Sequence, residues 1–270
     1  MPGTLYLVAT PIGNLEDITL RALRVLREAD LIACEDTRQT GKLLSHFGID
    51  KPMVSYHEHN EAARTQDLVS KLDGGIDVAL VSDAGTPLVS DPGYRLVTAA
   101  LAAGISVVPI PGASGVLSAL SGAGLPTDAF RFCGFLPPKQ GQRKKALEAL
   151  RGEDCTLVFY EAPHRILDAL VDVAAAYGER PVVVARELTK LHEEFLRGTA
   201  DQVRTQLAAR PSVKGEIVLL IGKGAPLASD TPIEEAVREL EQKGVPRMDA
   251  IKQVARERGL SKREVYKQVT

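Results

Sequence analysis

Ionisable side chains gather in two short segments that each follow a predicted strand. The segment CEDTRQTGK carries Glu35, Asp36 and Arg38, and the segment SYHEHNE carries His57 and Glu58. A carboxylate or an imidazole in such a place can act as a general base, and the planar guanidinium of arginine suits a phosphate. The pattern also has a structural explanation, because an acid between a strand and a helix can cap the helix. Both explanations stay open for Glu35 and Asp36.

Neither a metal site nor a disulfide framework is expected. His57 and His59 stand two residues apart, and no third ligand lies at a metal-binding spacing. The three cysteines, Cys34, Cys133 and Cys155, lie in unrelated segments. We expect them to be small buried hydrophobic residues.

Turn-forming residues are concentrated in five segments, each directly after a predicted strand. The segments are ATPIGNLEDI, CEDTRQTGK, SYHEHNE, SDAGTPLVSDPG and PIPGASG. In a parallel sheet the carboxyl ends of the strands meet at one edge, where ligands bind. Loops rich in Gly and Pro present backbone N–H and C=O groups in fixed directions and can hold a small polar cofactor. The absence of GxGxxG and GxxxxGK[ST] argues against a nicotinamide enzyme or a P-loop nucleotidase.

These segments require a framework of strands and helices. The predicted strands are TLYLVA, LIAC, DVALV, SVVPI, CTLVFY, PVVVA and EIVLLI, and helices are expected at residues 19–29, 61–72, 93–103, 143–150 and 163–177. Short runs of Val, Ile and Leu that alternate with helices are typical of α/β proteins with mostly parallel, buried sheets. After the fourth loop, we expect Asp91 to be the N-cap of the next helix and Pro92 its first residue.

The sequence predicts two α/β domains and a helical module. A Gly- and Ser-rich stretch at residues 111–125 separates a first domain, residues 1–114, from a second, residues 115–223. Residues 222–232, GKGAPLASDTP, have the composition of a flexible linker. Residues 231–270 predict three short helices of helix-turn-helix type, in which Ser261 and Glu264 form a capping box.

Basic residues are unevenly spread although the net charge is only −2. From residue 243 onward eight basic residues face three acidic ones, and the segment PPKQGQRKK carries four more bases: Lys139, Arg143, Lys144 and Lys145. Such patches suit RNA phosphates, although solvated helix faces have the same composition. Aromatic residues make up 4% of the chain and Trp is absent, which favours recognition of RNA shape over single-strand stacking.

A cytoplasmic protein is expected. No apolar run reaches the ~18 residues that span a bilayer, and the N-terminal segment lacks the basic start of a signal peptide.

The order of the motifs resembles that of the tetrapyrrole-methylase superfamily. The motifs are LVATPIGNLEDI, CEDTR, SYHEHNE, SDAGTPLVSDPG, PIPGASG, YEAPHR, ARELTKLHEEFLRGT and KGEIVLLI, which run from about residue 3 to residue 221. Within this superfamily, the chain closely resembles members that methylate a cytidine 2′-hydroxyl in 16S ribosomal RNA of the small ribosomal subunit. The resemblance implies two α/β domains of tetrapyrrole-methylase type, S-adenosyl-L-methionine held between them, and a homodimer.

The resemblance also implies which residues of this chain lie at the cofactor. In the motif YEAPHR, Pro163 has a structural explanation as the start of a helix, whereas Glu161 has no evident structural task. We therefore count Glu161 among the expected site residues. The expected cofactor-binding residues are Pro11, Asp83, Ala84, Gly85, Val89, Ser90, Ala113, Ser114, Glu161 and Glu216.

Methyl transfer to a ribose hydroxyl would be an in-line displacement by O2′ on the sulfonium methyl. A placed base that accepts the O2′ proton contributes roughly 10²–10⁴-fold. Asp36 is the first candidate and His57 the second, with Glu58 beside them, and Arg38 is expected to hold an RNA phosphate.

Two other functions stay open. One is methylation of a small tetrapyrrole-like or protein substrate, and the other is an RNA-binding assembly factor without catalysis. The C-terminal helices are expected either to bind RNA or to serve dimerisation.

Overall fold

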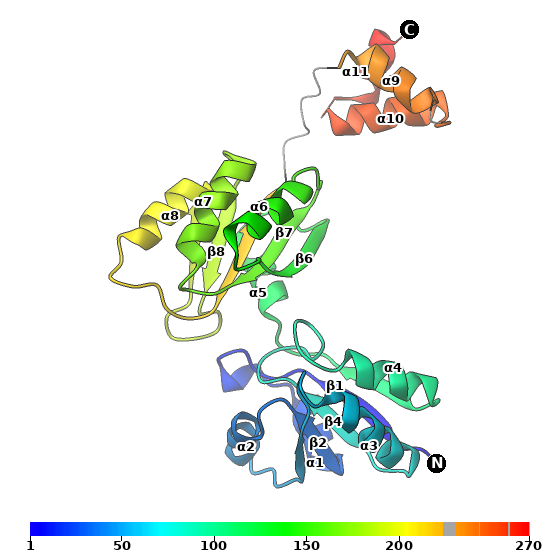
Figure 1. Cartoon of the computed structure of the whole chain (residues 1–270), viewed down its shortest axis with the longest axis vertical. Helices are drawn as coiled ribbons and strands as arrows, with labels where there is room; N and C mark the ends of the chain where they lie inside the picture. Colours follow the sequence, from blue (N-terminus) through cyan, green and yellow to red (C-terminus); the bar gives the residue numbers. More distant parts are fainter. Residues whose placement is uncertain (224–230, 243, 259, 270) are drawn as a thin grey trace. The chain divides into compact units, whose positions relative to one another are not determined.

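The computed structural model describes residues 1–223, 231–242, 244–258 and 260–269 (Figure 1). These form two compact units, the first comprising Met1–Gly122 with Arg186–Glu194 and the second Ala123–Ala185 with Phe195–Thr270. The predicted linker falls mainly on residues 224–230, outside the described residues.

The first unit contains a five-stranded parallel sheet. Its strands are β1 (Thr4–Val8), β2 (Leu31–Cys34), β3 (Met53–Ser55), β4 (Val78–Val81) and β5 (Ser106–Ile110), in the order β3-β2-β4-β1-β5. Every pairing between neighbours is parallel, which confirms the predicted arrangement of this half of the chain. The segments that follow the five strands therefore all leave the sheet at one edge.

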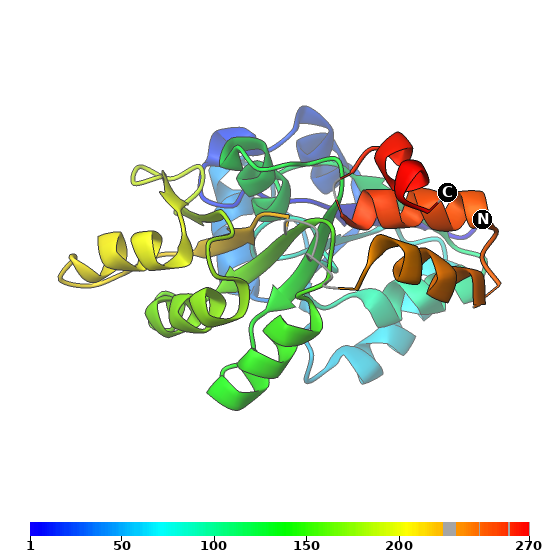
Figure 2. The ribbon, with the colours of Figure 1, turned by 90° about the horizontal axis from the view of Figure 1, so that it is seen from above.

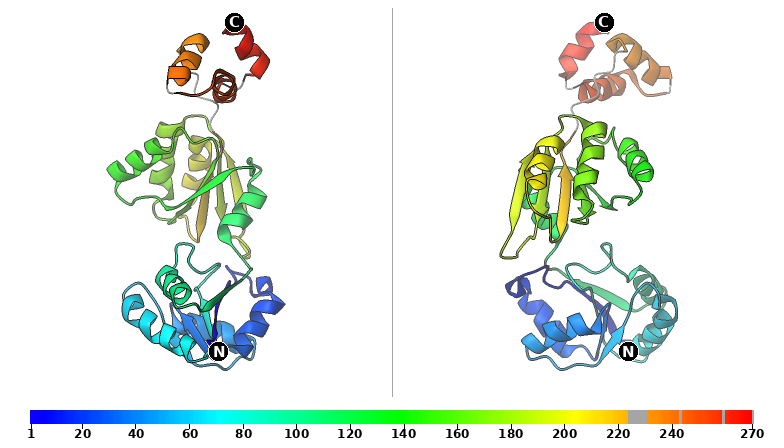
Figure 3. Two further views of the ribbon diagram at one scale, coloured as in Figure 1. Left: turned by 90° about the vertical axis from the view of Figure 1, so that its right-hand side faces the viewer. Right: turned by 60° about the vertical axis from the view of Figure 1, so that its left-hand side comes forward.

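Helices cover both faces of this sheet (Figure 3). Helices α1 (Leu20–Glu28) and α2 (Thr37–His46) share a core with Ile32 and Cys34, whereas α3 (Glu61–Asp73) and α4 (Tyr94–Ala102) share a core with Ala33. The alternation arises because successive side chains of a strand point to opposite faces. A short 3₁₀ helix, η1 (Leu15–Asp17), lies before α1, and α5 (Gly115–Ala123) follows β5.

The helix after β4 begins later than predicted. Its N-cap is Gly93, so neither Asp91 nor Pro92 has the expected capping role. Gly93 has a φ of +137°, and a Cβ there would lie 2.8 Å from Cδ2 of Leu80. Because only glycine fits this turn, the chain makes it after Pro92 and the helix starts at Tyr94.

The second unit contains a mixed sheet, in contrast to the predicted mostly parallel one. Its strands are β6 (Phe130–Phe135), β7 (Thr156–Glu161), β8 (Val182–Arg186), β9 (Glu194–Gly198) and β10 (Ile217–Ile221), in the order β6-β7-β10-β8-β9. β6 is parallel to β7, but β10 is antiparallel to β7. β10 is the last strand that the structure describes, and it lies beside β7 in the sheet. Its antiparallel direction could not be predicted, because a run of apolar residues does not show in which direction a strand pairs.

Three helices pack on one face of the second sheet. They are α6 (Gln140–Ala149), α7 (Ile166–Tyr177) and α8 (Ala200–Ala208), and α7 contacts both of the others. Their core joins Leu147, Leu170 and Val203 to Leu157 and Leu219 of the strands. Helix α6 starts three residues before the predicted position, so the basic segment is largely helical.

The C-terminal residues form three helices with a core of their own (Figure 3). They are α9 (Ile233–Gln242), α10 (Arg247–Glu257) and α11 (Lys262–Gln268), and the predicted capping box of Ser261 and Glu264 is confirmed at the start of α11. Within the described parts of the chain, no helix is both long and apolar enough to cross a membrane. Cys34 and Cys155 are buried, and Cys133 is half-buried.

Candidate active site

Hydrogen bonds join the loops that follow β1, β4 and β5 at the carboxyl edge of the first sheet. Thr10 and Gly85 exchange two backbone bonds, of 2.9 and 3.0 Å. The Thr10 hydroxyl donates to the carbonyl of Ser82 at 3.0 Å, and the Thr86 hydroxyl donates to that of Ala113 at 3.3 Å. Gly85 has a φ of +85°, a backbone conformation that glycine adopts without strain, and this allows its two hydrogen bonds with Thr10. Gly85 and Ala113, both predicted to bind the cofactor, therefore belong to one rigid arrangement.

The loop after β4 holds two residues in a left-handed backbone conformation that side chains disfavour. Leu88 has a φ of +72° and Ser90 a φ of +66°, and the intervening Val89 is exposed. Each such residue costs on the order of 1–3 kcal/mol and persists only where its surroundings enforce it. Strain of this kind clusters at ligand-binding sites, and it coincides here with Val89 and Ser90, two residues predicted at the cofactor.

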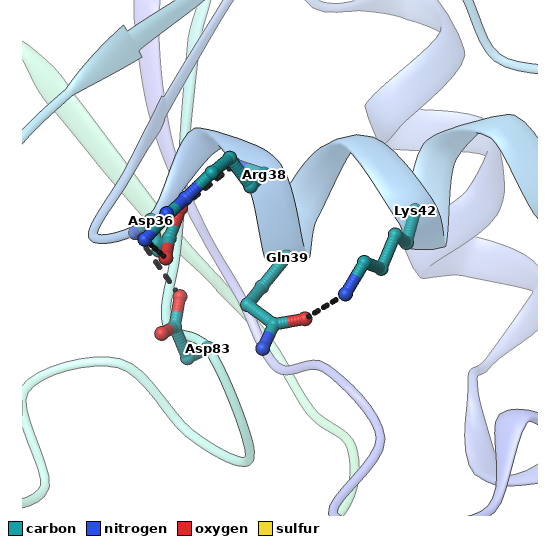
Figure 4. Close-up of polar contacts among 5 residues, drawn as sticks. All are labelled: Asp36, Arg38, Gln39, Lys42 and Asp83. Carbon is teal, nitrogen blue, oxygen red and sulfur yellow. Dashed lines mark hydrogen bonds and ion pairs between the residues drawn. The ribbon is translucent and has the colours of Figure 1, made fainter.

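Asp36 caps helix α2 and pairs with Arg38 (Figure 4). Its carboxylate accepts the Arg38 backbone N–H at 2.8 Å and lies 2.7 Å from Nη2 of the same residue. The backbone N–H of Asp36 donates to Asp83 at 3.1 Å, which links the loops after β2 and β4. The hydrogen bonds from Arg38 lower the pKa of Asp36 to about 2. The capping alternative describes Asp36 well, and so low a pKa makes it a weak base.

His57 is held by Asn60. The Asn60 side-chain oxygen accepts the His57 backbone N–H at 2.9 Å, which turns the Asn60 amide nitrogen toward Nε2 of His57 at 3.1 Å. The amide donates, so this assignment makes Nε2 the acceptor and places the ring proton on Nδ1. Nδ1 is buried without a hydrogen-bond partner in the described structure. The same amide nitrogen lies 3.1 Å from the Ser55 carbonyl and 3.2 Å from the Ser55 hydroxyl, so the Nε2 lone pair of His57 shares this donor with Ser55.

Carboxylates from three neighbouring loops influence one another at this edge. Burial, and then the charges of Glu35 and Asp83, raise the pKa of Asp91 to about 6. Burial, followed by Asp83 and the exposed Glu58, raises the pKa of Glu35. Asp91 was missed as a site residue because its place before Pro and Gly suggested a helix cap. The sequence held no direct signal for this role, because the pairing of β2 with β4 that brings Glu35 close to both aspartates of the long loop is visible only in the fold.

Replacing Asp91 by Asn is expected to stabilise the protein above pH 6 and not at pH 4. The folded-state pKa, about 6, lies above the ordinary value of 3.8. The contribution of Asp91 to stability is therefore fully present below pH ~4 and is lost as the pH rises through ~6. Two pKa units correspond to nearly 3 kcal/mol at most, and partial exposure reduces the gain to about 1–2 kcal/mol. Thermal unfolding at pH 4 and 7.5 measures it; an equal effect at both pH values would contradict this explanation.

Two predicted cofactor residues lie at one end of adjacent strands in the second unit. Glu161 ends β7 and pairs with Ile217, the residue directly after Glu216. Oε1 of the buried Glu161 accepts from the Ala162 N–H at 2.7 Å and from Nε of Arg165 at 2.8 Å. Oε2 is buried and has no hydrogen-bond partner in the described structure. The ion pair with Arg165 is a structural task that the sequence did not reveal, and Oε2 keeps its capacity to accept a bond.

The basic segment divides into one buried and three exposed side chains. Arg143 is buried, and its Nε and Nη2 each lie 2.7 Å from the Asp172 carboxylate of α7. It serves Asp172 and the Pro138 carbonyl rather than the surface. The exposed bases are Lys139, Lys144 and Lys145. No group of three or more His, Cys, Asp or Glu side chains within the described ranges is placed to hold a metal.

The chain matches a known family over most of its length. The profile of the Tetrapyrrole (Corrin/Porphyrin) Methylases matches residues 4–204. The chain is 49% identical over 271 residues to a ribosomal RNA small subunit methyltransferase I of Halalkalibacterium halodurans, covering 98% of this chain and 93% of that protein. The protein of the same name from Escherichia coli O157:H7 is 47% identical over 269 residues, with 98% and 94% covered.

A solved structure shows the same fold. It is uroporphyrin-III C-methyl transferase from Thermus thermophilus complexed with S-adenyl homocysteine, with a TM-score of 0.57 and 20% identity. The match covers 82% of this chain and 97% of that one.

Proposed function

The chain belongs to the tetrapyrrole methylase family, and we propose that it transfers a methyl group from S-adenosyl-L-methionine to a cytidine 2′-hydroxyl in 16S ribosomal RNA. The observation on which this proposal depends is the sequence identity of 49% and 47%, over 98% of the chain, to two proteins named ribosomal RNA small subunit methyltransferase I. The strained, hydrogen-bonded loop edge of the first sheet supports a small-molecule site within that activity.

The residues of this edge fit S-adenosylmethionine. When bound, it supplies an electrophilic methyl on a sulfonium whose departure leaves a neutral thioether. The sulfonium and the amino group of S-adenosylmethionine are both cations. The carboxyl groups of Asp83, Glu35 and Asp91 give the edge a negative potential, which attracts cations. The hydrogen bonds that join Gly85 to Thr10 and Ala113 to Thr86 fix the backbone groups of these loops at the same edge. We propose that Pro11, Ala84, Val89, Ser90 and Ser114 complete the site at this edge. Glu161 and Glu216 stay proposed cofactor-binding residues of the second unit.

The main task of the protein is to position the acceptor and exclude water, because the methyl donor is already reactive. The acceptor hydroxyl must also lose a proton. We propose Asp91 as the base, because a pKa near 6 keeps it ionised at neutral pH and leaves it far more basic than Asp36. Glu58 and the highly exposed Arg38 lie on the solvent side, where Arg38 can hold an RNA phosphate.

Replacing Asp36 by Asn is expected to lower turnover by no more than about tenfold. Asparagine is as good an N-cap as aspartate, so helix α2 keeps its start. Loss of the carboxylate removes a weak base and frees Arg38. Initial rates at saturating methyl donor, with the affinity for the donor measured separately by calorimetry, give the result. A loss of 10³-fold or more would restore Asp36 as the base.

RNA contact is proposed for two surfaces. Lys139, Lys144 and Lys145 are exposed around the start of α6, and Lys262 and Lys267 are exposed on the C-terminal helix α11. Basic side chains on such surfaces neutralise phosphates without reading sequence. A homodimer that acts on the small ribosomal subunit in the cytoplasm completes the proposal.

Labelled S-adenosylmethionine and small ribosomal subunits from a source that lacks the methyl group test the function. We expect one methyl per particle, recovered as a 2′-O-methylated cytidine after nuclease digestion. Label on a tetrapyrrole or a protein instead would support a different methylase. Binding to the particles without any transfer would indicate an assembly factor.

A further inference from the structure

An exposed aromatic ring stands at the same edge of the sheet as the candidate site. Tyr94 is 74% exposed, the highest value of any Phe or Tyr residue in the described structure. Only three other Phe or Tyr residues, Phe130, Phe135 and Tyr266, are exposed among the described residues, and all three lie in the second unit. Among the Phe and Tyr residues of the first unit that the structure describes, Tyr94 alone is exposed, and the exposed imidazole of His59 is a second ring in the site region.

The backbone fixes where Tyr94 stands. It is the first residue of α4 and directly follows Gly93, whose turn packs against Leu80 and Leu88. Helices α3 and α4 lie side by side (Figures 1 and 2). At their starts, Nε of Arg95 lies 2.8 Å from Oε1 of Glu61. The ring therefore extends from a helix start that is braced against the start of α3, three residues beyond Asp91.

The surroundings are those of an unpaired nucleotide site. An aromatic ring can stack on any nucleobase, and guanidinium groups hold the adjoining phosphates. Arg38 and Arg95, with 86% and 63% of their side chains exposed, flank the acidic edge from α2 and α4. The carboxylates in between disfavour phosphate and suit an uncharged group such as a ribose hydroxyl.

We propose that Tyr94 stacks on an unpaired base of the RNA substrate and so strengthens binding of the RNA that receives the methyl. This inference rests on the proposed function and adds a substrate-binding residue to it. The phenol ring, rather than its hydroxyl, performs the task, because stacking requires only the π-face.

Steady-state methylation of small ribosomal subunits tests the role with three variants. Tyr94→Ala is expected to raise KM for the particles roughly 5- to 150-fold, the range for loss of one stacked base. The turnover number should stay within about threefold, because the interaction is made equally in the ground and transition states. Tyr94→Phe retains the ring and should behave as the unaltered protein. Leu101→Ala removes most of another exposed side chain of α4 and controls for the general effect of shortening a side chain on this helix.

Several results would overturn the proposal. They are an unchanged KM in Tyr94→Ala, an equal loss in Tyr94→Phe, and a change of oligomeric state in Tyr94→Ala by light scattering, which would make the ring a subunit contact. Calorimetry with S-adenosylmethionine should give the same affinity in all variants. If the unaltered protein itself transfers no methyl to the particles, the proposed function fails, and the comparison among variants is not reached.

Discussion

Asp172→Ala is expected to lower the free energy of unfolding of the second unit by about 3–5 kcal/mol. Asp172 is buried in α7 and receives Nε and Nη2 of the buried Arg143 at 2.7 Å. Gln140 donates to its other oxygen at 3.3 Å, and Lys144 lies 3.8 Å away. Removing the carboxylate leaves a guanidinium buried without its counter-charge, which costs far more than the net value of the pair.

The measurement is thermal or urea unfolding of the full chain, followed by a probe specific to the second unit. Asp201→Ala is a matched control, because Asp201 pairs with Arg204 at 3.5 Å on the exposed face of α8. That surface pair should contribute less than about 1 kcal/mol. The double variant Arg143→Met, Asp172→Leu should recover most of the loss, since an apolar pair leaves no buried charge. Equal effects of Asp172→Ala and Asp201→Ala would contradict this assignment.

The same ion pair illustrates the limit of the sequence-based prediction for the basic segment. Lys139, Arg143, Lys144 and Lys145 look equivalent in the sequence, and all four were expected to face RNA. Only the packing of α6 against α7 reveals that Arg143 points inward to a carboxylate 29 residues away. In a helix that begins at residue 140, position 143 faces a different side from position 145. The helix was predicted to begin at residue 143, so this difference between the basic residues was not considered.

The parallel sheet of the first unit could be predicted because period and turn chemistry agree there. Val78–Val81 is buried throughout and is followed at once by loop residues, as a central parallel strand requires. The second sheet could not be predicted fully, because the direction of β10 depends on a pairing with β7 that lies 56 residues earlier. Local patterns contain the alternation of elements but not the partner that each strand selects.

The sequence placed the candidate site at a loop edge, and the structure brings those loops together there, but the tasks of the individual residues could not be resolved from the sequence. The segment SDAGTPLVSDPG identified the strained loop, yet it could not show that Leu88 and Ser90 adopt positive φ. Asp36 was the first candidate for the base, but hydrogen bonds from its neighbour Arg38 lower its pKa in the folded protein. Asp91 was overlooked because burial, which raises its pKa, is a property of the folded loop.

Asp91→Asn is expected to slow methyl transfer 10²–10⁴-fold while it leaves the affinity for S-adenosylmethionine within a few fold. The amide cannot accept the O2′ proton, although it keeps the shape of the carboxyl. In the unaltered protein the single-turnover rate should rise with pH through about 6 as the carboxyl ionises. That inflection should vanish in the variant, which should also be more stable at pH 7.5. An inactive protein that is more stable than the active one indicates a group retained for chemistry rather than folding.

The matched control for this experiment is Asp73→Asn at the exposed end of α3, which removes one carboxylate from the same unit without touching the site. Its rate and pH profile should equal those of the unaltered protein. Glu35→Gln separates the two carboxylates of raised pKa, because Glu35 lies within electrostatic range of Asp91. Loss of the negative neighbour should shift the inflection to lower pH and preserve most of the rate. Normal single-turnover rates in Asp91→Asn, with the large loss in Glu35→Gln instead, would assign the base to Glu35 and refute the role proposed for Asp91.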